Sequence, residues 1–310
     1  MTNRWFIYQQ EQFPIIRNGL FLAGFSFATI GYCLLLQDGA IGRSLLHLAG
    51  LAFLAFLNVF LCFLQLQIAN EFKDFSNHVK HHPNHPVSRG LVTLQELGIL
   101  GIATGAIQLG LALSANLSLV WLLLLLWGYV GLITREFFAP QWFRTYPVVT
   151  LLVRSIAVSL IALYASAWSW LTVGASVPQG LERFLLLTFL TSLLMQTSQI
   201  IGASNQEAVT RKQALPWGQT LPWRRQKLVI AWLGIVWLMS LAALLAAAPV
   251  QFVVPIALLL LFLLTASVAI AWRFLAHPVR KWASGVEFIS LLWGGIIYFN
   301  LGILPLLLQR

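Results

Sequence analysis

A run of polar residues with metal-binding and phosphate-binding side chains follows the second long apolar segment of the chain. It consists of Asn70-Glu71-Phe72-Lys73-Asp74 and, further on, His85-Pro86-Val87-Ser88-Arg89-Gly90. Residues four apart share one face of a helix, so Asn70, Asp74 and His78 lie together if the preceding helix continues. Magnesium takes one or two carboxylates together with substrate phosphates. The run therefore predicts a site for a metal-bound diphosphate, and an ordinary solvated helix end is the competing interpretation.

The composition is that of a membrane protein. Hydrophobic residues fill 59% of the 310 positions and charged residues only 9%. A spanning helix needs about 20 apolar residues, because its backbone must satisfy its own hydrogen bonds in the bilayer. We predict an all-α membrane protein, a single transmembrane domain of residues 1–310 that forms a nine-helix bundle. The predicted spans are residues 19–37, 45–69, 97–113, 117–134, 147–171, 184–203, 228–247, 250–272 and 288–308.

Lysine and arginine predict the orientation of the bundle. Short cytoplasmic loops retain these residues, whereas translocated loops avoid them. With a cytoplasmic N-terminus, fifteen of the nineteen basic residues fall on the cytoplasmic side, which also carries two long loops, residues 70–96 and 204–227. The net charge of +10 then reflects topology and attraction to anionic membrane lipids, and it does not indicate a nucleic-acid partner. We expect a multi-pass protein of a bacterial inner membrane or a photosynthetic membrane.

The first long loop resembles the signature of the UbiA superfamily of intramembrane prenyltransferases. That signature is N-D-x-x-D-x-x-x-D, followed by R-P and a glycine, between the second and third of nine helices. The asparagine, the second aspartate, the proline and the glycine of this pattern correspond, with the spacing kept, to Asn70, Asp74, Pro86 and Gly90.

Three positions depart from the signature. Glu71 replaces an aspartate, His78 replaces the last aspartate, and His85 replaces the arginine before the proline. Neutral imidazole is a poor ligand for a hard cation, so His78 does not inherit the role of an aspartate. The string of residues 135–138, Arg-Glu-Phe-Phe, also resembles a subgroup of the superfamily.

The resemblance implies a fold and a reaction. A prenyl diphosphate ionises, and its allylic carbon joins a lipophilic acceptor dissolved in the membrane. Mg²⁺ neutralises the leaving diphosphate in such a reaction, and we expect the catalytic and metal-binding residues to be Asn70, Glu71 and Asp74. Basic side chains then clamp the free phosphate oxygens. The candidate clamps are Lys73, Arg144, Arg154, Arg211 and Lys212.

The second long loop departs further from the superfamily, which places a second aspartate pair there. Glu207 is the only acid of this loop, so we expect one Mg²⁺ site at most, with Arg211 and Lys212 binding phosphate directly. A solvated basic loop explains the same residues. The loss of the acidic pair also leaves open a second interpretation, in which a degenerate family member serves as a lipid-binding or assembly subunit without catalysis.

Two further groups of residues have alternative explanations. Arg154 lies inside a predicted span, where a charge is costly, so it either faces a wet cavity as a phosphate clamp or extends to the headgroups. The four histidines His78, His81, His82 and His85 resemble one box of membrane di-iron enzymes. The chain holds only six histidines, too few for such a site, and Pro83 and Pro86 interrupt the helix that would align the cluster. A pH-responsive surface loop is the alternative.

Overall fold

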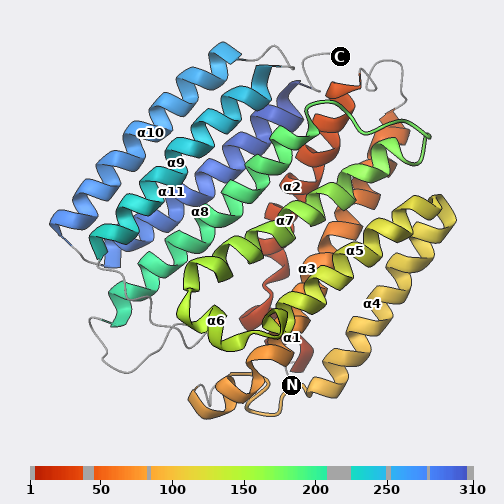
Figure 1. Ribbon diagram of the computed structural model, residues 1–310, viewed down its shortest axis with the longest axis horizontal. Helices are drawn as coiled ribbons and strands as arrows, with labels where there is room; N and C mark the ends of the chain where they lie inside the picture. Colours follow the sequence, from red (N-terminus) through yellow and green to blue (C-terminus); the bar gives the residue numbers. More distant parts are fainter. Residues whose placement is uncertain are drawn as a thin grey trace. The chain divides into compact units, whose positions relative to one another are not determined.

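The computed structural model describes residues 4–37, 45–81, 85–207, 225–248, 253–277 and 280–305, and Figure 1 shows the helices formed by these residues. The α-helices are α1 (Arg4–Gln12), α2 (Ile15–Leu36), α3 (Leu45–His81), α4 (Leu94–Ala115), α5 (Leu117–Thr134), α6 (Pro140–Thr145), α7 (Pro147–Trp170), α8 (Leu181–Glu207), α9 (Arg225–Ala247), α10 (Val253–Ala276) and α11 (Arg280–Tyr298). A 3₁₀ turn follows α5 at Glu136–Phe138, and a π-helix follows α11 at Phe299–Ile303.

Within these described residues, nine helices are long and apolar enough to cross a membrane, α2 to α5 and α7 to α11. The prediction of an all-α protein with nine spans is therefore confirmed. The boundaries differ at the polar ends. The segment predicted as a loop over residues 70–96 is helical up to His81 and again from Leu94, because α3 extends well beyond its apolar part. α4 begins there because Thr93 and Glu96 form a reciprocal capping box, with Glu96 N donating to Thr93 Oγ1.

The chain divides into two compact units, and α2 and α7 contribute residues to both. The first unit comprises Met1–Ile30, Ser44–Trp142 and Ile161–Ser176. In this unit α3 packs against α4 and α5, which also pack against each other. A polar network inside the unit joins its helices, since the Tyr164 hydroxyl donates to Asn58 Oδ1 and the Gln108 amide donates to the Asn58 carbonyl. Hydrogen bonds between spans hold helices together where no water competes for the polar groups.

The second unit contains the helices α8 to α11, which run side by side in Figure 1. Each of the four packs against two others, so that α8, α9, α10 and α11 form a closed ring. Two buried tryptophans tie this ring together. Trp232 Nε1 of α9 donates to Ser290 Oγ of α11 at 2.9 Å, and Trp293 Nε1 of α11 donates to Ser267 Oγ of α10 at 2.9 Å.

The packing of this ring predicts that two tryptophans of α9 differ sharply in how much they contribute to stability. Trp232 is fully buried, whereas Trp237, also in α9, is 60% exposed. Trp232→Ala removes a packed aromatic ring and a hydrogen bond, a change that costs about 3–5 kcal/mol in a core. We expect a clear fall in the midpoint of thermal unfolding of the detergent-solubilised protein. Trp237→Ala is the matched control and should leave the midpoint nearly unchanged; equal shifts for the two variants contradict the packing described here.

Candidate functional site

The residues predicted to hold the diphosphate lie in the last turns of α3. This helix has 37 residues, or about 55 Å at 1.5 Å per residue, which exceeds the roughly 30 Å hydrocarbon core. Its polar end therefore continues the helix that spans the membrane. Asn70 and Asp74 are one turn apart on one face of α3 and are both half-buried. The predicted alignment of these two side chains on one helix face is present in the structure.

Glu71 differs from its two neighbours because its carboxyl group is buried among protein groups. The residue is 2% exposed. Gln67, one turn earlier in α3, donates its Nε2 amide to Glu71 Oε1 at 3.3 Å, and His85 Nε2 lies 3.8 Å from the same oxygen. Tyr8 of α1 lies beside this carboxyl group, and burial, followed by the proximity of Glu71, raises the pKa of Tyr8. Glu71 thus joins α1, α3 and the turn at residue 85.

The turn that carries His85 is built by local hydrogen bonds. Arg89 N donates to the His85 carbonyl at 2.9 Å, and Leu91 N donates to the Pro86 carbonyl at 3.0 Å. Gly90 has a φ of +70°, a conformation that residues with a Cβ rarely adopt. This explains why a glycine follows the proline at this spacing. Val87 and Val92 pack beneath the turn against Ile68 and Tyr8.

Two ion pairs hold α1 onto this end of the unit. Arg89 lies 2.6 Å from Glu11, and Arg4 lies 2.6 Å from Glu96. All four side chains are partly exposed, so each pair contributes little free energy on its own. The pairs link α1 to the turn after α3 and to the first turn of α4, and they thereby help to keep Tyr8 beside Glu71.

Lys73 has a protein partner of the opposite charge. Its ammonium lies 2.8 Å from the carboxylate of Glu136, and these side chains are only 14% and 17% exposed. Lys73 was predicted to clamp a diphosphate; in the structure its ammonium pairs with Glu136 and links α3 to the segment that follows α5.

The segment that contains Glu136 has an unusual backbone. Glu136, Phe137 and Phe138 have φ values of 48°, 50° and 59°, three successive residues in the left-handed region. This region costs roughly 1–2 kcal/mol per residue with a Cβ. The pair with Lys73 and the edge-on contact of the Phe137 and Tyr129 rings, with centroids 6.0 Å apart, stabilise the conformation. Strained backbone of this kind is often found at functional sites.

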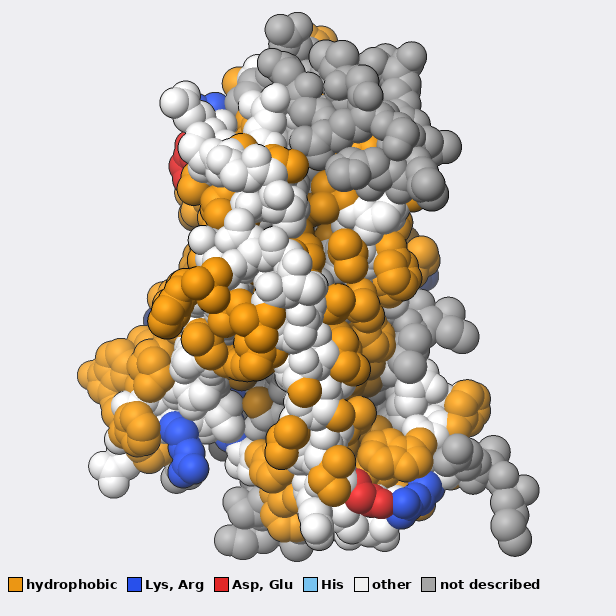
Figure 2. Space-filling model, turned by 90° about the vertical axis from the view of Figure 1, so that its right-hand side faces the viewer, with side chains coloured by type: hydrophobic (Ala, Val, Ile, Leu, Met, Phe, Trp, Pro, Cys, Tyr) orange, Lys and Arg blue, Asp and Glu red, His pale blue; other side chains and the backbone are white. Residues whose placement is uncertain are grey.

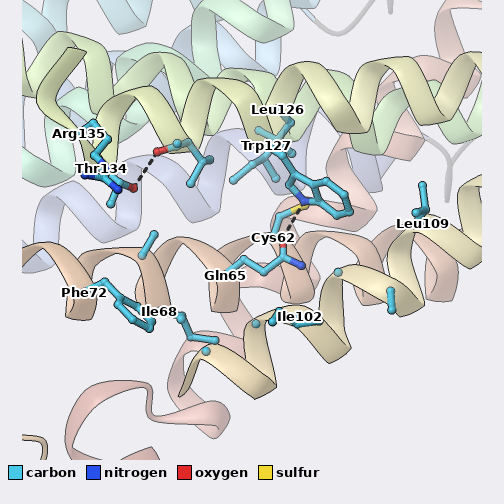
Figure 3. A pocket seen from close by; sticks show the side chains of 18 residues that line it. Cys62, Gln65, Ile68, Phe72, Ile102, Leu109, Leu126, Trp127, Thr134 and Arg135 are labelled. Atoms are coloured by element: carbon cyan, nitrogen blue, oxygen red, sulfur yellow. Dashed lines mark hydrogen bonds between the residues drawn. The ribbon is translucent and has the colours of Figure 1, made fainter. Parts of the chain in front are cut away.

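A groove of about 650 Å³ runs along the opposite side of α3 from Asp74, between α3, α4 and α5. Figure 3 shows the groove with Arg135 and Thr134 near one end and Leu109 near the other. The groove is apolar apart from Gln65, which accepts a hydrogen bond from Trp127 Nε1 at 3.0 Å, and the two polar groups at its end. Asn70, Glu71 and Asp74 do not line this groove.

The other predicted clamps belong to different parts of the chain. Arg144 lies in α6, and its side chain is outside the described part of the structure, as are Arg211 and Lys212. Arg154 lies in α7 and is half-buried, with a contact partner within the chain. Among the described residues, no group of three or more His, Cys, Asp or Glu side chains is arranged to hold a metal ion. His78 and His81 are helical residues of α3, and His82 lies outside the described ranges.

Two residues near the end of α3, Gln67 and Tyr8, were not predicted to contact Glu71. Gln67 precedes Glu71 by four positions, a spacing that could have revealed their contact. No sequence pattern pointed to Tyr8, because its contact with Glu71 depends on how α1 folds back onto α3. In the second unit, α11 begins at Arg280, eight residues before the predicted ninth span of residues 288–308, so Glu287 lies two turns inside the helix. A Cβ on Gly202 of α8 would collide with the Glu287 carboxyl group.

The fold is shared with a solved membrane enzyme. The chain superimposes on digeranylgeranylglyceryl phosphate synthase with a TM-score of 0.59 and 15% sequence identity, over 98% of this chain and 99% of the synthase. A UbiA homologue from Archaeoglobus fulgidus, solved with Cd²⁺, gives a TM-score of 0.46 at 13% identity over 94% of this chain and 98% of that one. The chain matches no protein-family model and no curated protein sequence. The all-helical membrane fold predicted from the sequence is thus one that the chain shares with a solved membrane enzyme.

Substitutions at Phe138, which is 77% exposed, test whether the left-handed turn after α5 is strained. Phe138→Gly removes the Cβ that makes this conformation costly, and we expect it to stabilise the protein by about 1 kcal/mol. Phe138→Ala removes the same exposed ring but keeps the Cβ, so it is the matched control and should not stabilise. Thermal unfolding in detergent compares the two variants, and an alanine variant as stable as the glycine variant contradicts the strained geometry.

Proposed function

We propose that this protein is an intramembrane prenyltransferase that moves an isoprenoid group from a prenyl diphosphate to a lipophilic acceptor. The observation that carries the proposal is the polar face formed by Asn70 and Asp74 where α3 leaves its apolar span. The fold shared with digeranylgeranylglyceryl phosphate synthase supports it. The acceptor and the prenyl diphosphate are both dissolved in the membrane, which suits the nine apolar spans found among the described residues.

The donor atoms of this face suit one Mg²⁺. Asn70 offers an amide oxygen and Asp74 a carboxylate, and Mg²⁺ completes its shell with diphosphate oxygens and water. Glu71 is better suited to a positioning role, because its carboxyl group is already engaged by Gln67 and His85. In this proposal Asn70 and Asp74 hold the metal diphosphate, and Glu71 fixes the end of α3 that presents them.

The chemistry is a substitution at the allylic carbon. The bond between this carbon and the diphosphate oxygen breaks, and its electron pair leaves with the diphosphate. The acceptor supplies the electron pair of the new bond and loses a proton. When bound, Mg²⁺ supplies positive charge that stabilises the leaving diphosphate. Arg144, Arg154, Arg211 and Lys212 remain the proposed clamps for further phosphate oxygens, whereas Lys73 is assigned to hold Glu136.

A second candidate function is a lipid-binding or assembly subunit that keeps the fold without the reaction. One observation favours it. The burial of Glu71 among Gln67 and His85 leaves Asp74 as the carboxylate of the α3 face, where the superfamily signature has more than one. The two functions differ in whether diphosphate is released.

Turnover distinguishes the two candidates. Purified full-length protein in lipid nanodiscs is incubated with a labelled prenyl diphosphate and Mg²⁺, and diphosphate release is measured with a mixture of membrane quinol and lipid acceptors present. We expect Mg²⁺-dependent release that Asp74→Asn lowers by about 100-fold or more, the magnitude for loss of one group that stabilises developing charge.

Two variants serve as controls. Glu182→Gln changes an acid whose side chain is 71% exposed and should leave release unchanged. Glu71→Gln keeps the size of the side chain and its capacity for hydrogen bonds. Because Glu71 is proposed to position the helix end, this variant should retain most of the Mg²⁺-dependent diphosphate release. Release by the wild type that is no higher than by Asp74→Asn contradicts catalysis and supports the subunit function.

A further inference from the structure

The groove between α3, α4 and α5 has the length of a lipid chain in one membrane leaflet. On α4 its lining extends from Gly98 to Leu109, which is about 16 Å at 1.5 Å per residue. Half of a roughly 30 Å hydrocarbon core has the same length. The groove exists because small residues line it, and Gly98, Gly101 and Ala106 of α4 leave space that larger side chains would fill.

The groove opens to the outer surface of the first unit. Ile102 and Phe72, at its edges, are 76% and 45% exposed. Figure 2 shows a face on which hydrophobic side chains cover much of the described surface and acidic side chains are visible only toward its ends. An apolar chain from the bilayer can therefore enter from the side.

A positive charge marks one end of the groove. Arg135 lies immediately after α5 and lines the groove next to Thr134 (Figure 3). The neighbouring carboxylate of Glu136 is compensated by Lys73 at 2.8 Å, so it does not cancel the charge of Arg135. In the part of the chain that the structure describes, no carboxylate forms an ion pair with Arg135. Guanidinium groups bind phosphate oxygens through short, charge-assisted hydrogen bonds.

We propose that this groove is a binding site for an anionic phospholipid, with one acyl chain between α3, α4 and α5 and the phosphate at Arg135. Both the length of the groove and the charge at its end fit a lipid of a single leaflet, which enters with its headgroup on the side of Arg135. The site is separate from the Asn70 and Asp74 face, and the inference does not rest on the proposed transfer reaction.

Native mass spectrometry of the purified full-length protein tests the site. The protein is titrated in detergent with dioleoyl phosphatidylglycerol or with dioleoylglycerol, which has the same chains and no phosphate. We expect one phosphatidylglycerol to bind at least about tenfold more tightly than dioleoylglycerol, as a hydrogen bond to a charged group predicts. Arg135→Gln should abolish this preference.

A matched pair of variants tests the chain-binding part of the groove. Ala106→Phe fills the groove and should weaken the binding of phosphatidylglycerol by about tenfold or more. This is the magnitude expected when part of an acyl chain is no longer buried. Ala103→Phe, on the same helix but outside the groove, should bind like the wild type. Circular dichroism and gel filtration establish that both variants are folded.

Three results would overturn the proposal. If the two lipids bind equally well and Arg135→Gln has no effect, the bound lipid is only non-specific annular lipid. Equal retention by Ala106→Phe and Ala103→Phe places the lipid elsewhere. Displacement of phosphatidylglycerol by geranylgeranyl diphosphate, together with loss of diphosphate release in Ala106→Phe, assigns the groove to the prenyl substrate instead. The last result leaves the proposed transfer reaction intact.

Discussion

A carboxyl group buried at the end of a membrane-spanning helix must find partners inside the protein, because leaving it unsatisfied costs several kcal/mol. Glu71 meets this requirement with Gln67, His85 and the adjacent Tyr8. These partners come from α3, from the turn after it and from α1, so one side chain fixes three elements. The turn in which Gly90 adopts a left-handed conformation and the ion pairs of α1 both follow from bringing these elements together.

The polar residues at the end of α3 therefore have different roles. Glu71 faces protein groups, whereas Asn70 and Asp74 share another face of the same helix turn. Lys73 lies on a third side and holds the strained segment after α5. The four polar residues between positions 70 and 74 thus face three directions and serve three purposes, because each residue of a helix is rotated by about 100° from the one before it. The proposed phospholipid groove lies along yet another side of α3, beside Phe72.

The sequence alone predicted the fold class and the nine spans, because a long apolar segment that crosses a bilayer satisfies its backbone hydrogen bonds by forming a helix. It also predicted that Asn70 and Asp74 share a helix face, since that depends only on local periodicity. It did not predict that Glu71 is buried or that Lys73 pairs with Glu136. Those contacts join residues far apart in the chain, and their formation depends on how α1 and the segment after α5 fold back onto α3. Gly98, Gly101 and Ala106 were visible in the sequence, but a groove appears only when α3 and α5 are packed beside them.

In the proposed function, the face formed by Asn70 and Asp74 binds a metal diphosphate, and Glu71 supports the helix end that carries it. Isothermal titration calorimetry with a non-reactive prenyl thiodiphosphate tests it directly, with and without Mg²⁺, on the wild type, Asp74→Asn and Glu71→Gln. We expect the wild type to bind the analogue in a Mg²⁺-dependent manner, Glu71→Gln to retain this binding and Asp74→Asn to lose it. Binding that is the same in Asp74→Asn and the wild type, or that does not require Mg²⁺, contradicts it.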